Sequence, residues 1–319
     1  MGIADPVKTR NRSKPFHTRN SKDLLPIVAV LAAVILWGGS FAAMRITIQT
    51  FNPWLVMWLR MAVAAAVLLP FAGKLMPKYS KRGDWKMLLP MVIFQPCLYF
   101  LFESYALTYT TSSQAGIIAA TLPIMVLIGA RMVFSEALHT GAICGIVLSI
   151  ACVATLTLLS GAGDVASNPL LGNSLEVLAM MSAAAYMIVV KKMSLRYNPW
   201  SLTALQIIGG TLFFSPGIYY LIHIEYSSIQ WQTIAAIVYL GAFVTLAAFG
   251  LYNWAISKIS ASRASAFINL VPVIAVCIGW MALDETLNTL QGIAAAGVII
   301  GVWLSQKSPG PQVADSSGC

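Results

Sequence analysis

Two charged residues stand within long apolar stretches of this 319-residue sequence, and they are its strongest candidates for chemistry. Arg60 follows Pro53 by seven residues, which is about 10 Å along a helix that starts at the proline. Glu103 precedes Tyr109 by six residues, near the end of another apolar stretch. If these two helix ends lie on the same side of a membrane, the two charges lie at similar depth and could pair.

This pair has two interpretations, and both are kept. In the first, the charges neutralise one another and only hold two helices together. In the second, Arg60 attracts an anionic group such as the carboxylate of a solute, while Glu103 binds a proton or a cationic group. Ionisable residues inside apolar spans are costly to bury, so a functional role is the stronger expectation.

Polar and aromatic residues in the apolar sequence form a second set of candidates. They offer hydrogen bonds and stacking faces to a solute, although the same residue types also join helices or anchor them at a membrane surface. The set comprises Trp37, Tyr99, Tyr105, Tyr186, Gln206, Tyr252, Asn253 and Asn269.

Two prolines and two carboxylates complete the candidates. Pro123 and Pro272 lack an amide donor, so we expect each to kink its helix and to be a candidate hinge. Glu136 and Glu285 follow these helices, and we expect each to cap the start of the next helix rather than to act as a gate.

The elements that position these residues are predicted to be membrane-spanning helices. Hydrophobic residues make up 58% of the chain and charged residues only 10%, against about 25% charged in an average soluble protein. Apolar runs of about 20 residues can each cross the hydrocarbon core as a helix. Ten such runs are expected, at 24–47, 53–72, 85–108, 113–134, 138–160, 172–192, 199–222, 231–255, 262–282 and 287–306.

Basic residues predict the orientation. All but two of the 20 lysines and arginines fall in the tails and in connections on one side, and the exceptions are Arg45 and Arg60. Because basic residues stay in the cytoplasm, we expect a multi-pass plasma membrane protein, the inner membrane if it is bacterial, with both termini cytoplasmic. The net charge of +9 then reflects topology and contact with anionic lipid, and no nucleic-acid partner is expected.

A short motif occurs twice. The sequence FNPW at 51–54 returns as YNPW at 197–200, and SEAL at 135–138 matches DETL at 284–287. In each motif the asparagine is predicted to cap a helix that begins at the proline. Five spans per copy is an odd number, so the second copy must enter the membrane the opposite way, which predicts an inverted repeat typical of transporters.

The stretches LWGGSFAAMRI and FNPWLVMWLRMAVAAAVLLP, the Pro123 helix and SEAL, with a degenerate second copy, resemble the EamA-type family of the drug/metabolite transporter superfamily. The resemblance covers residues 24 to 306 and implies an all-α membrane protein of ten transmembrane helices, arranged as two inverted five-helix repeats. The expected domains are a basic tail (1–23), a first EamA-like repeat (24–160), an external linker (161–171), a second repeat (172–306) and a C-terminal tail (307–319).

The resemblance also implies a secondary-active exporter of amino acids, other metabolites or drug-like compounds, working by alternating access. A facilitative carrier or an importer is the alternative within this class, and an intramembrane enzyme acting on a lipid or small solute is the alternative outside it. We expect a monomer or homodimer that contacts membrane lipid and a small-molecule substrate, with protons as the candidate coupling ion.

Other chemistry has little support. The three histidines are scattered and the five cysteines have no C-x-x-C spacing, so no metal site is expected. There is no glycine-rich phosphate loop, so no cofactor is expected and no enzymatic activity is assigned.

Overall fold

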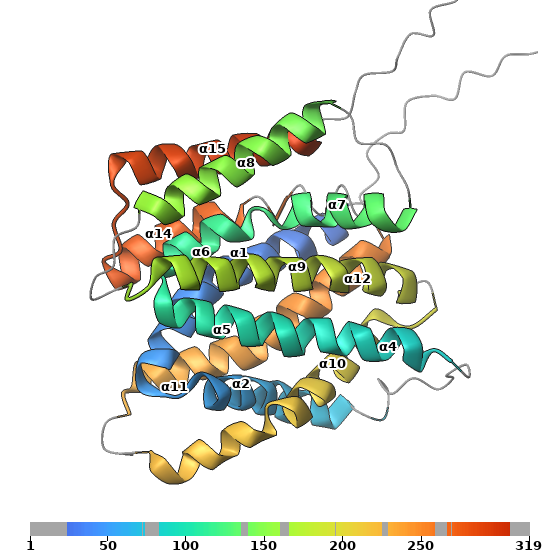
Figure 1. Cartoon of the computed structure of the whole chain (residues 1–319). Coiled ribbons are helices and arrows are strands. Elements are labelled where there is room, and N and C mark those ends of the chain that lie inside the picture. The colour runs from blue at the N-terminus through green and yellow to red at the C-terminus, as the bar shows by residue number, and fades with distance from the viewer. Residues whose placement is uncertain are drawn as a thin grey trace, which may run out of the picture.

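The computed structural model describes residues 24–71, 73, 83–134, 140–159, 166–194, 196–224, 229–258, 267–268 and 270–306. Within these ranges every regular element is a helix, and the helices pack side by side (Figure 1). The prediction of an all-helical protein is confirmed. Asn269, Glu136 and both predicted tails lie outside the described residues.

The described part of the first half of the chain contains nine helical segments. They are α1 (Leu24–Thr50), α2 (Pro53–Leu68), η2 (Leu69–Phe71), α4 (Trp85–Val92), η3 (Ile93–Leu98), α5 (Tyr99–Tyr109), α6 (Ser112–Ala119), α7 (Leu122–Phe134) and, completing this half, α8 (Thr140–Leu159). The second half contains α9 (Pro169–Met193), α10 (Pro199–Phe213), η4 (Ser215–His223), α11 (Trp231–Val238), η6 (Tyr239–Ala248), α12 (Phe249–Lys258), α14 (Val271–Leu283) and α15 (Thr289–Gln306).

Several of these segments are long and apolar enough to cross a membrane. Among the described residues there are six such helices, or seven if the bent pair Pro199–Phe213 and Ser215–Ile222 is one span. Three further apolar helices, Ile143–Leu156, Val271–Leu283 and Thr289–Leu304, have 10–17 residues, fewer than the about 20 that cross the hydrocarbon core. The protein therefore has multiple candidate spans, and the expected number of ten stays a prediction.

The repeated motif starts a helix in both halves, as predicted. The Asn52 side chain accepts a 3.0 Å hydrogen bond from the amide of Trp54, and the Asn198 side chain accepts a 2.9 Å bond from the amide of Trp200. In each case the intervening proline occupies the first turn. An asparagine cap satisfies an amide that the helix itself leaves unpaired, so the same local chemistry fixes both starts.

The two halves pack against each other reciprocally. α9 packs along α5, and α1 packs against α12, so the first helix of each half contacts the third span of the other (Figure 1). Within each half, a basic residue of the first helix also bonds to the third span of the same half: Arg45 donates to the backbone oxygen of Leu107, and Lys191 donates to that of Ile256. These contacts join matching positions of the sequence repeat, which indicates that the duplication extends to the packing.

The span from Trp85 to Tyr109 is broken in its middle. Gln95 has extended backbone angles (φ −148°, ψ 120°) inside an otherwise helical segment. Two side chains from the other half satisfy backbone oxygens at the break: Ser182 donates to Phe94 and Gln206 donates to Gln95, each at 3.1 Å. Non-helical backbone inside a membrane needs such partners, so the break is supported by α9 and α10.

The two prolines expected to kink their helices instead lie at helix starts. Pro123 is the second residue of α7, after a turn that separates this helix from α6. Pro272 lies in the first turn of α14. Proline is favoured in a first turn because the amide it lacks has no partner there anyway. The expectation that these prolines are hinges stays a prediction. Any hinge motion at them would occur at the α6–α7 junction and at the start of α14, rather than within a helix.

Candidate functional site

A cavity lies between helices of both halves. It has an empty volume of about 540 Å³, counting the space at its opening. Its walls come from α1, the broken span at η3 and α5, the α6–α7 junction, α9, α12 and the start of α14. The lining is mainly apolar and aromatic, with polar groups from Ser40, Gln95 and the tyrosines Tyr99, Tyr186 and Tyr252. Small-molecule sites typically have this composition.

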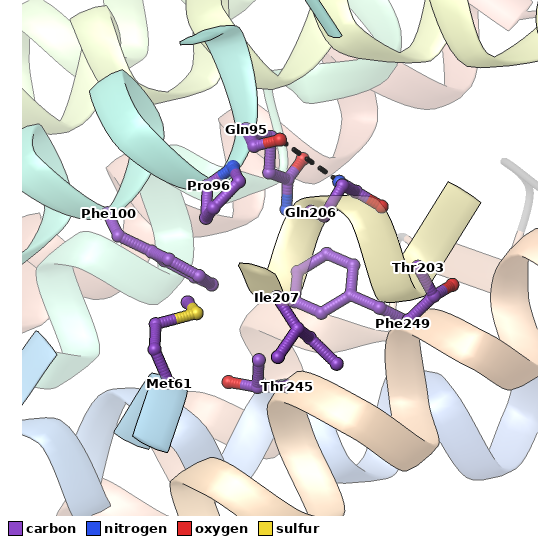
Figure 2. A pocket seen from close by; sticks show the side chains of 9 residues that line it. All are labelled: Met61, Gln95, Pro96, Phe100, Thr203, Gln206, Ile207, Thr245 and Phe249. Carbon is purple, nitrogen blue, oxygen red and sulfur yellow. Dashed lines mark hydrogen bonds between the residues drawn. The ribbon is translucent and has the colours of Figure 1, made fainter. Parts of the chain in front are cut away.

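A smaller pocket of about 220 Å³ adjoins the cavity, since Gln95 and Phe249 line both. Figure 2 shows its lining, in which the Gln206 side chain reaches the backbone oxygen of Gln95 at the helix break. The full lining is Met61, Gln95, Pro96, Phe100, Thr203, Gln206, Ile207, Thr245 and Phe249. The break thus borders both spaces and shapes the wall between them.

Aromatic rings from the two halves meet in the larger cavity. The ring centroid of Trp37 lies 4.9 Å from that of Tyr252 and 5.3 Å from that of Phe249. The indole nitrogen of Trp37 is buried and has no hydrogen-bond partner among the described residues. A tryptophan N–H is a donor only, so this atom is suited to receive an acceptor from a bound molecule.

A hydrogen-bonded cluster holds the second-half candidates together. The Tyr186 hydroxyl donates to Asn253 Oδ1 at 2.8 Å, and Asn253 Nδ2 donates to Thr203 at 3.0 Å. The Tyr186 hydroxyl also lies 3.4 Å from Gln206 Oε1. Tyr186 lines the larger cavity, whereas Thr203 and Gln206 line the smaller pocket. Asn253 lines neither space itself, and its hydrogen bonds orient Tyr186 and Thr203, which do.

The charge pair lies next to these spaces without lining either. Arg60 Nη1 is 3.9 Å from Glu103 Oε2, and both side chains are almost completely buried. Arg60 Nε donates to Thr245 at 3.0 Å, and the guanidinium carbon lies 4.0 Å from the centre of the Phe100 ring. The structure thus brings Arg60 and Glu103 together, as their expected depths suggested.

Tyr99 connects the charge pair to the cavity. Its hydroxyl donates a 2.6 Å hydrogen bond to Glu103 Oε1, and the residue also lines the larger space. On the other side of the pair, Phe100 and Thr245 contact Arg60 and line the smaller pocket. A change of charge at the pair can therefore be transmitted to the cavity wall through one hydrogen bond or one ring contact.

The remaining sequence candidates fall outside this arrangement. Tyr105 on α5 is half-buried and lines neither space, and Asn269 lies outside the described residues.

Sequence reasoning missed three residues that the structure places close to the site: Gln95, Thr245 and Glu176. The proline that follows Gln95 is a signal for the break. Glu176 is completely buried on α9, and neither of its carboxyl oxygens has a hydrogen-bond partner among the described residues. The predicted span began at residue 172, whereas α9 begins at Pro169, so Glu176 lies two turns deep rather than near the helix end.

Glu285 caps a different helix from the one expected. Its carboxylate accepts hydrogen bonds from the amides of Ser112 and Ser113, at 2.9 and 2.8 Å, and from both hydroxyls. It therefore caps the start of α6 in the first half, rather than α15, which follows it in the sequence. The backbone turns at Asp284, whose φ is 52°, and this turn directs the glutamate back toward α6.

Comparison with known proteins agrees with the duplicated architecture. The EamA-like transporter family matches residues 24–158 and again residues 170–306. The uncharacterized transporter YcxC of Bacillus subtilis is 30% identical over 289 residues, covering 86% of this chain and 90% of that protein. A probable terminal-alkyne amino-acid exporter of Streptantibioticus cattleyicolor is 21% identical over 279 residues, covering 88% and 92%. A crystal structure with 16% identity has a TM-score of 0.59 and covers 90% of this chain and 99% of the other.

Proposed function

Since the chain belongs to the EamA-like transporter family, within the drug/metabolite transporter superfamily, we propose that it is a secondary-active carrier of small organic solutes that works by alternating access. Its apolar helices and its family make it an integral membrane protein. The names of the family and its relatives point to transport rather than catalysis. The proposal further includes ten spans in two inverted repeats, with substrate moving between them.

The observation that carries this proposal is the cavity formed by both halves. Trp37 comes from the first helix of one half, and Tyr252 and Phe249 come from the third span of the other, with ring centroids about 5 Å apart. Rocking of one half against the other would separate these rings and open the space. The aromatic walls and the unpaired indole N–H of Trp37 favour a solute with an apolar or aromatic face and a hydrogen-bond acceptor.

The arrangement of the helix ends suggests which state is described. If both termini are cytoplasmic, the α5–α6 junction and the start of α9 lie on the external side. A polar cluster joins them there, because Thr110 donates to Asn173 at 2.7 Å and Asn173 donates to Gln114 at 3.1 Å. In this topology the larger cavity is lined instead by the cytoplasmic half of α9, including Met187, and by α12, the last segment of the span Trp231–Lys258, through Tyr252. We infer an inward-facing or occluded state, closed outside.

Export is the proposed direction. The support is a relative whose name describes it as a probable amino-acid exporter. The solute would enter the cavity from the cytoplasm and leave when the external cluster opens. Import through the same cavity uses the same residues and differs only in the gradient that drives it.

A flux experiment tests the proposal. The full-length protein is reconstituted in liposomes, and a pool of labelled amino acids, amines and aromatic cations is screened for uptake against a trapped unlabelled pool. Saturable exchange without chemical conversion of the solute is expected. Trp37→Ala should abolish it, whereas Trp280→Ala, at a tryptophan that is 64% exposed on the outer surface of the helix bundle, should not. Conversion of the solute, or no exchange for any pool member, would contradict the carrier proposal.

Orientation needs its own test. Reporter fusions that are active on only one side of the membrane, placed after residue 306 and in the connection between residues 159 and 169, should report opposite sides. The same side for both would contradict the proposed topology.

A further inference from the structure

We propose that Glu176 is the proton-binding residue of this carrier, and that Glu103 is held as the ionised partner of Arg60. This inference rests on the proposed transport function, and it assigns the coupling step to a residue other than the one indicated by the sequence. The ligand is a proton delivered from water, which converts the Glu176 carboxylate to the carboxylic acid.

The position of Glu176 is the first argument. Its relative exposure is 0%, and both carboxyl oxygens are buried without a hydrogen-bond partner among the described residues. It lies seven residues after Pro169 on α9, a depth of about 10 Å along the helix. α9 runs beside α5 (Figure 1). α5 carries Glu103 and Tyr99, and Glu176 is close enough to interact electrostatically with both.

The cation and the hydrogen-bond donor that could stabilise an ionised carboxylate here both contact Glu103. Oε2 of Glu103 pairs with Arg60, and Oε1 accepts the Tyr99 hydrogen bond. Glu103 therefore has a cation and a donor, whereas Glu176 faces a second negative charge and has neither partner among the described residues. With both carboxyls ionised, this buried group of one guanidinium and two carboxylates would carry a net charge of −1.

Among the described side chains, none on the other elements that pack against α9 supplies the missing charge. These elements carry the following titratable or charged residues: Lys86 on α4, Cys97 on η3, Arg131 on α7, Cys144 and Cys152 on α8, and Tyr252 and Lys258 on α12. None with a described side chain contributes to the electrostatics of Glu176, for which Glu103 is the charged neighbour. α6 carries no such residue.

The charge balance decides which group takes the proton. An ionised carboxylate buried without a partner is far more costly than one that is paired and hydrogen-bonded. One proton on Glu176 neutralises the cluster, whereas a proton on Glu103 would leave Glu176 ionised and weaken the pair with Arg60. Movement of α9 relative to α5 during alternating access would expose Glu176 to water and release the proton, which couples proton release to the change of state.

Infrared spectroscopy tests the site without knowledge of the solute. The full-length protein in lipid is titrated with acid and base in sodium-free buffer, and the carbonyl band of protonated carboxylic acids is followed. In the wild type, a band from a buried carboxylic acid should disappear reversibly as the pH rises. Glu176→Gln should abolish it, and Glu176→Asp, which keeps a carboxyl, should retain a titrating band and serves as the folding control.

Two further variants make the assignment specific. Glu103→Gln should retain a titrating acid band from Glu176, shifted in pH because the neighbouring charge has been removed. Glu285→Gln is the matched control, because it replaces another buried carboxylate, one that accepts the amides of Ser112 and Ser113, and it should leave the band of Glu176 in place. The inference is overturned if the band survives Glu176→Gln, if it is lost in Glu103→Gln, or if sodium at constant pH removes it in the wild type, which would indicate a sodium site.

The flux assay keeps the two proposals distinguishable. In Glu176→Gln, solute exchange without a pH gradient should persist, while accumulation driven by a pH gradient should be lost. If the band behaves as expected but no solute moves, the transport proposal fails while the proton site stands. If solute moves and gradient-driven accumulation survives in Glu176→Gln, the coupling inference fails and the transport proposal stands.

Discussion

Oε2 of Glu285 accepts a 2.6 Å hydrogen bond from the hydroxyl of Ser113, a residue 172 positions earlier in the chain. The same carboxylate also accepts the first two backbone amides of α6. A residue that precedes the last helix thus satisfies the start of a helix in the first half. Helix starts leave amides unpaired, and by accepting two of them this carboxylate joins the second half of the chain to the first.

Glu285→Ala should destabilise the protein, because it leaves buried amides and hydroxyls without an acceptor. We expect a loss on the order of 3 kcal/mol, as for several hydrogen bonds to a charged group. Thermal unfolding in detergent measures it. Asp284→Asn is the matched control, because Asp284 is exposed and asparagine tolerates its positive φ. Equal melting temperatures for the two variants would contradict the proposed role.

The Arg60 and Glu103 pair should show strong coupling in a double-mutant cycle. Removing one partner of a buried pair leaves an uncompensated charge and costs about 3 to 5 kcal/mol. The Arg60→Met variant should therefore lose several kcal/mol of its free energy of unfolding, about 3 to 5 kcal/mol. The double variant Arg60→Met, Glu103→Gln should recover part of that lost free energy. Chemical unfolding of the four proteins in mixed micelles gives the coupling free energy. Simple additivity of the two single changes would show that the pair makes no net contribution.

The sequence predicted the helical class and the repeat because both depend on local patterns. Apolar runs, the two Asn-Pro starts and the one-sided basic residues can be read without knowing the packing. The depth of Arg60 followed from counting forward from the Asn-Pro helix start at residues 52–53, and the depth of Glu103 from counting back from the expected helix end at Tyr109.

The sequence could not reveal what depends on contacts between distant segments. Glu285 was expected to cap its own helix, since nothing local indicates that the turn at Asp284 directs it to α6. Glu176 was overlooked because an error of three residues in a predicted helix start moved it toward the membrane surface. The role of Gln95 could not be predicted either, because its backbone oxygen at the helix break accepts a hydrogen bond from Gln206 of the other half.

Trp37→Phe should weaken solute binding without a large effect on stability. The indole N–H has no partner within the described protein, so its removal breaks no internal hydrogen bond. If it donates to the solute, the half-saturating concentration in exchange should rise about tenfold, the equivalent of one hydrogen bond of about 1.4 kcal/mol. Trp280→Phe, on the exposed surface of α14, is the control. An unchanged half-saturating concentration would remove Trp37 from the proposed solute contacts.

Close packing at Gly39 provides a prediction about the fold around the cavity. A Cβ added at Gly39 would lie 2.7 Å from the Tyr239 hydroxyl, which donates a 2.8 Å bond to the Leu36 oxygen, and 3.5 Å from the ring carbon that bears this hydroxyl. Gly39→Ala should therefore cost about 1 to 3 kcal/mol through overpacking. Tyr239→Phe removes the obstructing oxygen, so we expect the double variant to be more stable than the sum of the two single losses predicts.

A second glycine provides the matched control for Gly39. Gly292 on α15 has open space where a Cβ would stand, so Gly292→Ala should stabilise its helix by up to about 1 kcal/mol. Thermal unfolding of all four variants gives the comparison. If Gly39→Ala and Gly292→Ala shift the melting temperature in the same direction, close approach of η6 to α1 is not what requires glycine at position 39. Opposite shifts, with rescue by Tyr239→Phe, would show that this contact holds α1 against η6 beside the cavity.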